Sequence, residues 1–314
     1  MDKLGLAIHN GFMYSWNTHD QFSNTNPFKC IKQVDQTLKH YTQPKTVPII
    51  LNSEKIRLSK IDGMRNDTTE GRFVWDFFWI TCRDLLDEDE IPYEFYDGLK
   101  KNLNREYLHH FPSLGKTMDC DMYVACFTSK NDEEVIFDRY GPCAIEFGSM
   151  LDYLTDLLKP PMSECIELCR VLYSPSIFRD YLRKAIVDPY KVANVDEWPR
   201  LYPYFNNLIS YWSCLVKSPY WDNERECRIL FYLPKDDDYR SKLINEYPWI
   251  TEDSWDHVLI PLKPILKTTF IRSRNESEIL QIIDNLNDHW ECIQRGPTSQ
   301  SSFLQYDAVL EYKG

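Results

Sequence analysis

Two acidic side chains lie two residues apart in the sequence WDNERECR, near position 225. On a β-strand, Glu224 and Glu226 would lie on the same face, together with Arg228. Burying two carboxylates and a guanidinium is costly unless they serve a purpose, although a solvent-exposed strand face with Arg228 balancing the acids is the simpler alternative. We predict that Glu224 and Glu226 are catalytic and that Trp221 and Arg228 bind substrate.

The triplet His40-Tyr41-Thr42 begins an extended segment. A histidine at the start of a strand can bind a ligand hydroxyl through one ring nitrogen. The alternative is a structural histidine whose hydrogen bonds are satisfied within the fold. We predict His40 as a third catalytic residue, and Tyr41, Thr42 and Ser59 as substrate-binding residues.

The sequence Asn66-Asp67-x-x-Glu70 brings two carboxylates to one face if a helix begins there. Such a pair can hold a divalent cation. Helix capping by Asn66 or Asp67, with Glu70 near the positive helix end, explains the pattern more simply. We therefore predict no metal site and place Asn66 and Asp67 among the substrate-binding residues.

Tyr140 follows Asp138 and Arg139 and precedes Gly141, at the end of a predicted helix. Its ring can stack on a base or on nicotinamide, so we predict that it binds substrate; the alternative is an ordinary core tyrosine. The sequence contains no phosphate-binding glycine loop, no dinucleotide fingerprint and no serine-hydrolase or zinc-protease motif. With 10 glycines in the chain, a glycine-rich phosphate loop is not expected.

The composition limits the class of partner. The 314-residue chain has a net charge of −12 and a sequence pI near 5.1, so duplex DNA, whose binding depends on many lysines and arginines, is not the expected partner. We find no apolar run that could span a bilayer and no signal peptide. The 10 cysteines lie outside CxxC pairs, as is typical of reduced thiols. We expect a cytoplasmic protein that does not bind membranes.

Helical and strand-like apolar patterns alternate along the chain, which indicates an α+β fold in a single domain over 38–314, after an N-terminal extension over 1–37. The pattern predicts helices over 27–39, 46–52, 70–86, 93–110, 131–140, 149–158, 176–187, 202–216 and 273–286. It predicts strands over 55–60, 122–128, 143–147, 170–173, 224–233, 258–262 and 269–271, then a polar stretch over 296–302 and an extended end over 304–312.

In this order, the polar clusters resemble a bacterial and phage family, the domain of unknown function two-nine-seven-one. The resemblance covers about residues 38–290, with Phe137 where the family has tryptophan and Thr128 where it has serine. Members occur near phage-defence and abortive-infection genes, which implies an antiviral role and a phage or host protein partner, but no settled activity. The matching positions are His40-Tyr41, Ile56 to Ser59, Asn66-Asp67 with Glu70, Cys126-Phe127, Tyr140-Gly141 through Phe147, and Trp221 with Glu224, Glu226 and Arg228.

A weaker similarity, in outline, is to ADP-ribosyltransferases, which share the histidine-led strand, the apolar turn, a second strand and a late Glu-x-Glu strand. In that class a carboxylate stabilises the oxocarbenium-like ribose as the bond to nicotinamide breaks. The resemblance implies an ADP-ribosyltransferase-like fold with NAD as substrate. It implies that His40 binds ribose, Tyr140 stacks on nicotinamide, Glu226 stabilises the cation and Glu224 positions the acceptor.

Three functions remain open at this stage. The first is a nucleotide-binding protein that cleaves NAD or transfers its ADP-ribose, as an antiphage defence effector. The second is a metal-dependent hydrolase of nucleic acids or nucleotides that uses Asp67, Glu70 and Glu226. The third is a non-catalytic sensor of a phage protein or a nucleotide. Loss of activity with a chelator would distinguish the second from the first.

Overall fold

The computed structural model describes residues 2–8, 38–61, 72–103, 111–112, 119–129, 134–147, 166–235, 237–247, 251–253, 257–262, 268–298 and 305–313. These segments form an α+β fold in a single domain, as predicted. Residues 3–8 are helical, and Leu4 is buried against the helical layer. The start of the expected N-terminal extension therefore packs on the domain.

The described strands form one sheet in which every pair is antiparallel, and β4 (Asp119–Thr128) lies at its centre. One edge of β4 pairs with β1 (Leu38–Thr42) near Thr128 and with β2 (Lys55–Lys60) near Val124. The other edge pairs along its length with β7 (Glu226–Pro234). Residues from three distant parts of the sequence therefore meet at the C-terminal end of β4.

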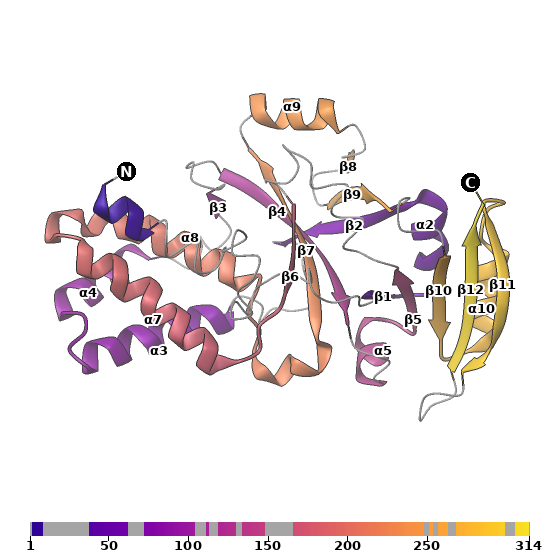
Figure 1. The fold of residues 1–314 in the computed structure, drawn as a ribbon, viewed down its shortest axis with the longest axis horizontal. Coiled ribbons are helices and arrows are strands. Elements are labelled where there is room, and N and C mark those ends of the chain that lie inside the picture. The colour runs from indigo at the N-terminus through magenta and orange to yellow at the C-terminus, as the bar shows by residue number, and fades with distance from the viewer. Residues whose placement is uncertain are drawn as a thin grey trace.

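The sheet extends outward from this centre in three directions (Figure 1). Beyond β1 lie β5 (Cys143–Phe147), β10 (Thr268–Ser273), β12 (Gln305–Tyr312) and β11 (Trp290–Thr298). Beyond β2 lie β9 (His257–Pro261) and β8 (Thr251–Asp253). On the other side of β4, β6 (Ile166–Arg170) borders β7. The short strand β3 (Phe111–Pro112) pairs with the start of β4.

The helices cover both faces of the sheet. One layer gathers beside the N-terminus in Figure 1 and comprises α3 (Arg72–Asp87), α4 (Tyr93–Asn102), α7 (Pro175–Val192), η4 (Val195–Arg200) and α8 (Leu201–Ser213). The opposite face packs against α2 (Thr46–Ser53) and α10 (Glu276–Asp284). The remaining described helices are α5 (Glu134–Tyr140), η5 (Pro219–Glu224) and α9 (Asp237–Glu246).

Strand β7 explains how two cores arise from one sheet. Its side chains alternate between faces, so Leu230 packs in the helical-layer core and Ile229 and Phe231 pack in the opposite core. Both faces are buried, which is why this strand reads as a continuous apolar run. At its start the same alternation places Glu226 and Arg228 on the helical-layer face.

Several predicted boundaries are corrected. The helix predicted over 93–110 ends at Asn102, because Leu103 is extended. The strand predicted over 170–173 lies earlier, at Ile166–Arg170. Helix α9 and strand β11 were not predicted, and β11 includes part of the stretch taken as polar loop. The predicted helix over 149–158 lies outside the described residues, as does most of 27–39, whose end is strand.

Two further features of the described residues concern their helices and their cysteines. None of their helices combines the length and the hydropathy needed to cross a membrane. Their cysteines are free thiols and most are buried, in agreement with the prediction of reduced cysteines.

Candidate functional site

The candidate site begins where η5 ends and β7 begins. η5 is a 3-10 helix, in which residues three apart lie on the same side, so Trp221 and Glu224 share one side. Arg225 then adopts the left-handed conformation, with φ 44° and ψ 44°, and ends the helix. The strand starts only at Glu226.

The prediction that Glu224 and Glu226 share one strand face is therefore wrong. Glu226 and Arg228 do share a face of β7, as predicted, whereas Glu224 ends a helical turn. The left-handed residue Arg225 separates the helical turn from the strand, between the two glutamates. Their side chains nevertheless meet, because each binds the same lysine.

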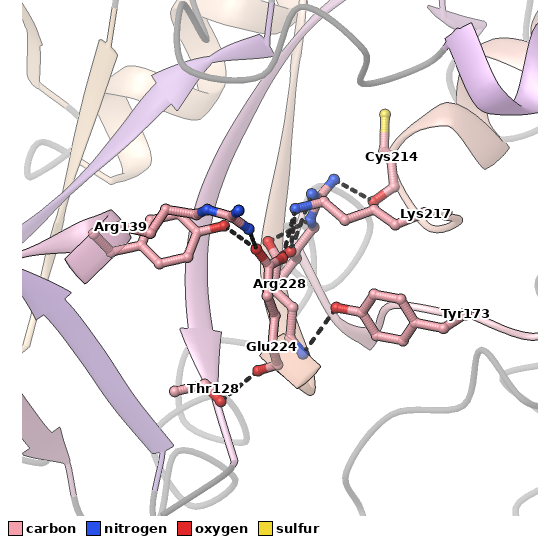
Figure 2. Close-up of polar contacts among 9 residues, drawn as sticks. Thr128, Arg139, Tyr173, Cys214, Lys217, Glu224 and Arg228 are labelled. Atoms are coloured by element: carbon pink, nitrogen blue, oxygen red, sulfur yellow. Dashed lines mark hydrogen bonds and ion pairs between the residues drawn. The ribbon is translucent and has the colours of Figure 1, made fainter. Parts of the chain in front are cut away.

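Glu226 lies in a buried ion-pair network. Figure 2 labels its partners Arg228 and Lys217. Arg228 donates from Nε to Glu226 Oε1 at 2.8 Å and from Nη2 to Oε2 at 3.3 Å. Lys217, just after α8, places its Nζ 2.7 Å from Glu226 Oε2. Arg228 also donates from Nη1 to the Cys214 carbonyl at 2.7 Å. The carboxylate is thus held by two cations.

Glu224 extends the network towards α5. Its Oε1 accepts hydrogen bonds from Tyr140 Oη at 2.5 Å and from Arg139 Nη1 at 3.1 Å, and its Oε2 lies 3.1 Å from Lys217 Nζ. The Thr128 hydroxyl donates to the Glu224 carbonyl at 2.5 Å (Figure 2). Four separate segments are therefore joined through this one residue: β4, α5, η5 and the segment that follows α8.

Four members of the network are almost inaccessible to solvent. Arg228 is 0% exposed, Glu226 5%, Glu224 6% and Lys217 7%. Burial would by itself raise the pKa of the Glu226 carboxyl, but the charges of Arg228 and Lys217 outweigh it and lower that pKa to about 2. Glu226 is therefore ionised throughout the physiological pH range.

Glu226 also borders a pocket of about 470 Å³ at the ends of β6 and β7. The other members of the network (Arg139, Tyr140, Lys217, Glu224 and Arg228) do not line it. Its wall is formed by Ser129, Arg170, Val171, Leu172, Tyr173, Ser174, Pro219, Asp222, Arg225, Glu226 and Cys227.

Tyr173 links the pocket wall to the backbone of the site. Its hydroxyl oxygen accepts a hydrogen bond from the Glu226 N–H at 3.2 Å. Burial, and then the nearby Glu226 charge, raise the pKa of the Tyr173 hydroxyl, so it stays protonated at neutral pH. Among the described residues its proton has no acceptor, which leaves it able to donate to a ligand.

Two further contacts fix α5 beside the network. The Arg139 guanidinium lies over the Trp221 ring, 3.7 Å from the ring centroid. After Tyr140, Gly141 has φ 138°, and a Cβ there would lie 2.3 Å from the Thr42 carbonyl oxygen. Only glycine permits this close approach of α5 to β1. Tyr140 is 38% exposed, and its hydroxyl donates to Glu224 Oε1.

His40 lies on the other face of the sheet from Glu226. Thr128 on β4 pairs with Lys39 on β1 and with Glu226 on β7. Because directly paired residues point to the same face of a sheet, these three side chains lie on one face. His40 follows Lys39 and so points the opposite way, where its ring lies 5.7 Å from that of Phe127. The structure thus does not bring His40 into one cleft with Glu226.

The surroundings of His40 are those of a structural histidine. Its Nδ1 lies 3.0 Å from the Cys126 carbonyl oxygen. Burial lowers the pKa of the imidazole, and the bond to that carbonyl opposes the shift only in part. The ring is therefore neutral at neutral pH and donates its Nδ1 proton to the backbone.

The remaining predicted residues are dispersed. Tyr41 is buried with Ile136 under α5, and Thr42 pairs with Cys143 at the end of β1. Ser59 pairs with Val124, four residues along β4 from Thr128, or roughly 13 Å at strand spacing. None of these lines the pocket. Asn66 and Asp67 lie outside the described residues, as does Glu70.

Several residues of the site were not predicted, namely Arg139, Lys217, Tyr173, Arg170 and Arg225. Lys217 had a detectable signal, because a lysine directly after the apolar run SCLV is unusual unless it is paired. Tyr173 and Arg170 had none, because they reach the pocket only through the pairing of β6 with β7.

Within the described part of the chain, no group of three or more histidine, cysteine, aspartate or glutamate residues could hold a metal ion. No protein family model, no curated protein and no solved structure matches the chain. The resemblance to the domain of unknown function two-nine-seven-one and the outline similarity to ADP-ribosyltransferases therefore remain predictions.

Proposed function

We propose that the protein binds NAD or a related nucleotide in the pocket beside Glu226 and breaks its N-glycosidic bond to nicotinamide. The observation that supports this is the position of Glu226, whose carboxyl group is ionised, among the residues that line a pocket of about 470 Å³. That volume falls in the range of small-molecule sites, roughly 300–1,000 Å³.

The chemistry requires a fixed negative charge beside the ribose. When the C1′–N bond breaks, its electron pair leaves with nicotinamide and the ribose becomes an oxocarbenium ion. Water or another acceptor then attacks C1′ and loses a proton. A carboxylate already in place stabilises the developing positive charge without reorganisation. We assign this role to Glu226.

The other residues position this carboxylate or contact the ligand. Arg228 and Lys217 hold Glu226 ionised and fixed, and they lie behind it, away from the pocket wall. Tyr173 lines the pocket and has a protonated hydroxyl, which suits a ribose or phosphate oxygen. Glu224 positions Lys217 instead of taking part in the reaction, and His40 has no role in it.

The proposal is tested by incubating the purified protein with NAD and measuring released nicotinamide by liquid chromatography. Wild type should release nicotinamide, and Tyr173→Phe should slow the release because it removes a ligand contact. Tyr204→Phe is the matched control, since the Tyr204 hydroxyl donates to Ala185 inside the helical layer. It removes the same atom from a buried tyrosine and should leave the rate unchanged.

Glu226→Gln should abolish release, and circular dichroism and thermal unfolding would show whether it still folds. Glu226→Asp keeps the charge but shortens the side chain, so a folded variant with a strongly reduced rate supports the assigned role. If the folded wild type releases no nicotinamide, with or without candidate acceptors, the proposed reaction is refuted.

A second candidate function has its own supporting observation. Both oxygens of Glu226 already contact cations, Arg228 at 2.8 Å and Lys217 at 2.7 Å, which suits a structural carboxylate in a non-catalytic nucleotide sensor. Under this candidate NAD would raise the melting temperature and no product would form. The antiviral role and the phage or host protein partner rest on the family resemblance, and the cytoplasmic location rests on the sequence pattern; all three are compatible with either candidate.

A further inference from the structure

Two arginines line the same pocket as Glu226. Arg170 ends β6 and pairs with Cys227, whereas Arg225 is the left-handed residue between η5 and β7. The pairing of β6 with β7 and the turn at Arg225 therefore bring to one pocket two residues that lie 55 positions apart in the numbering.

Neither arginine is used in an ion pair within the described part of the chain. This is unusual here, because the protein carries 48 acidic and 36 basic residues and its other described arginines are often paired, as Arg183 is with Glu88 and Glu90. An arginine at a pocket wall in an acidic protein, without a carboxylate partner, retains its capacity to bind an anion from solution.

The rest of the wall also suits an anion. Ser129, Tyr173 and Ser174 supply hydroxyl groups, and the pocket lies at the start of α7, where the helix dipole is positive. The carboxylates at the wall are Asp222 and Glu226. Behind the wall, Glu226 binds Arg228 and Lys217, and Lys217 also binds Glu224. With Arg170 and Arg225 included, these four cations outnumber the three carboxylates of Asp222, Glu224 and Glu226.

We infer that Arg170 and Arg225 bind the phosphate groups of the ligand. This deepens the proposed function, on which it rests for the identity of the ligand as a nucleotide. A guanidinium presents paired N–H donors that match two phosphate oxygens, and two guanidinium groups at one pocket fit a diphosphate. Phosphates at the arginines leave the ribose end of the nucleotide for the rest of the pocket wall, which includes Tyr173.

The experiment is calorimetric titration of the full-length protein with pyrophosphate, with ADP-ribose and with nicotinamide riboside, which carries no phosphate. Pyrophosphate and ADP-ribose should bind, with affinity that falls as salt increases, and nicotinamide riboside should bind at least tenfold more weakly than ADP-ribose. Arg170→Gln and Arg225→Gln should each weaken ADP-ribose binding about tenfold or more, and Arg225→Lys should recover part of the loss, since it keeps the charge without the paired donors.

Glutamine suits position 225 because, like arginine, it is unbranched at Cβ and adds no new strain to the left-handed backbone. The matched control is Arg57→Gln, an exposed arginine on β2 outside the pocket, which should bind as wild type does. The inference is overturned if wild type binds neither phosphate probe, if it prefers a dicarboxylate such as glutarate, or if the double variant binds ADP-ribose as tightly as wild type.

The two proposals fail in different ways. Arginine-dependent binding of ADP-ribose without nicotinamide release leaves the phosphate site standing and removes the reaction. Nicotinamide release that is unchanged in the Arg170→Gln/Arg225→Gln variant supports the reaction and overturns the phosphate site.

Discussion

Replacing Arg228 by methionine should destabilise the fold more than any single change at an exposed arginine. The side chain is 0% exposed, and its guanidinium donates to both oxygens of Glu226 and to the Cys214 carbonyl. Methionine has a similar length, so apolar packing is largely kept. Breaking one side of a buried ion pair costs about 3–5 kcal/mol, and we expect a loss of unfolding free energy of that size.

Arg139→Met is the matched control. Arg139 belongs to the same network but is 35% exposed and makes one hydrogen bond, of 3.1 Å, to Glu224. Exposed ion pairs contribute about 0–1 kcal/mol, and the contact with the Trp221 ring adds about 0.5–1 kcal/mol. We expect a loss of about 1 kcal/mol, measured for both variants by urea unfolding followed through tryptophan fluorescence.

A double variant separates electrostatics from packing. Arg228→Met with Glu226→Gln removes both charges, so its cost should be at least about 1 kcal/mol smaller than the sum of the two single costs. Additive costs, or an Arg228→Met cost no larger than that of Arg139→Met, would show that the network is not the tightly coupled, desolvated unit described above.

Three further outcomes follow from the geometry. The pKa of Glu226 lies at about 2 in the fold, below the usual 4.5. The stabilisation from its charge is therefore fully present above about pH 4.5 and is lost as the pH falls towards 2. Unfolding measured across this range should show a loss of about 3 kcal/mol in unfolding free energy for wild type, and Glu226→Gln should lack this loss. Gly141→Ala should destabilise by about 2 kcal/mol or more in urea unfolding, because its Cβ would meet the Thr42 carbonyl oxygen, whereas Gly296→Ala, with nothing within 4 Å, should be close to neutral. His40→Asn should lower the melting temperature yet leave nicotinamide release unchanged, and a folded variant with a reduced rate would return His40 to the site.

Local sequence patterns predicted those elements whose signal lies within the element itself. The strand over 55–60 and the strand over 143–147 were placed at the bounds that the structure has. The helix α3 was placed within two residues, because its apolar residues recur at helical spacing. The buried pair of Glu226 and Arg228 was also predictable, since alternation alone puts them on one face of β7.

The features that define the site depend instead on strand register and on one backbone conformation. His40 and Glu226 point to opposite faces because Lys39 pairs with Thr128, and a shift of one residue would have reversed this. That register joins β1 and β4, which lie 86 positions apart at the His40–Cys126 contact, and no local pattern encodes it. The left-handed conformation of Arg225 was equally hidden, because glycine is the residue that normally signals it.

Stability alone does not account for the network around Glu226. A buried ion-pair group of this kind can often be replaced by apolar residues with no loss of stability, or even with a gain. What apolar residues cannot supply is an ionised carboxylate of fixed orientation at the edge of a pocket. Arg228 and Lys217 hold that carboxylate from behind, and Glu224, reached through the left-handed turn, holds Lys217 in place from the other side. The proposed reaction supplies a reason for the arrangement, because it requires an ionised carboxylate of fixed orientation beside the ligand.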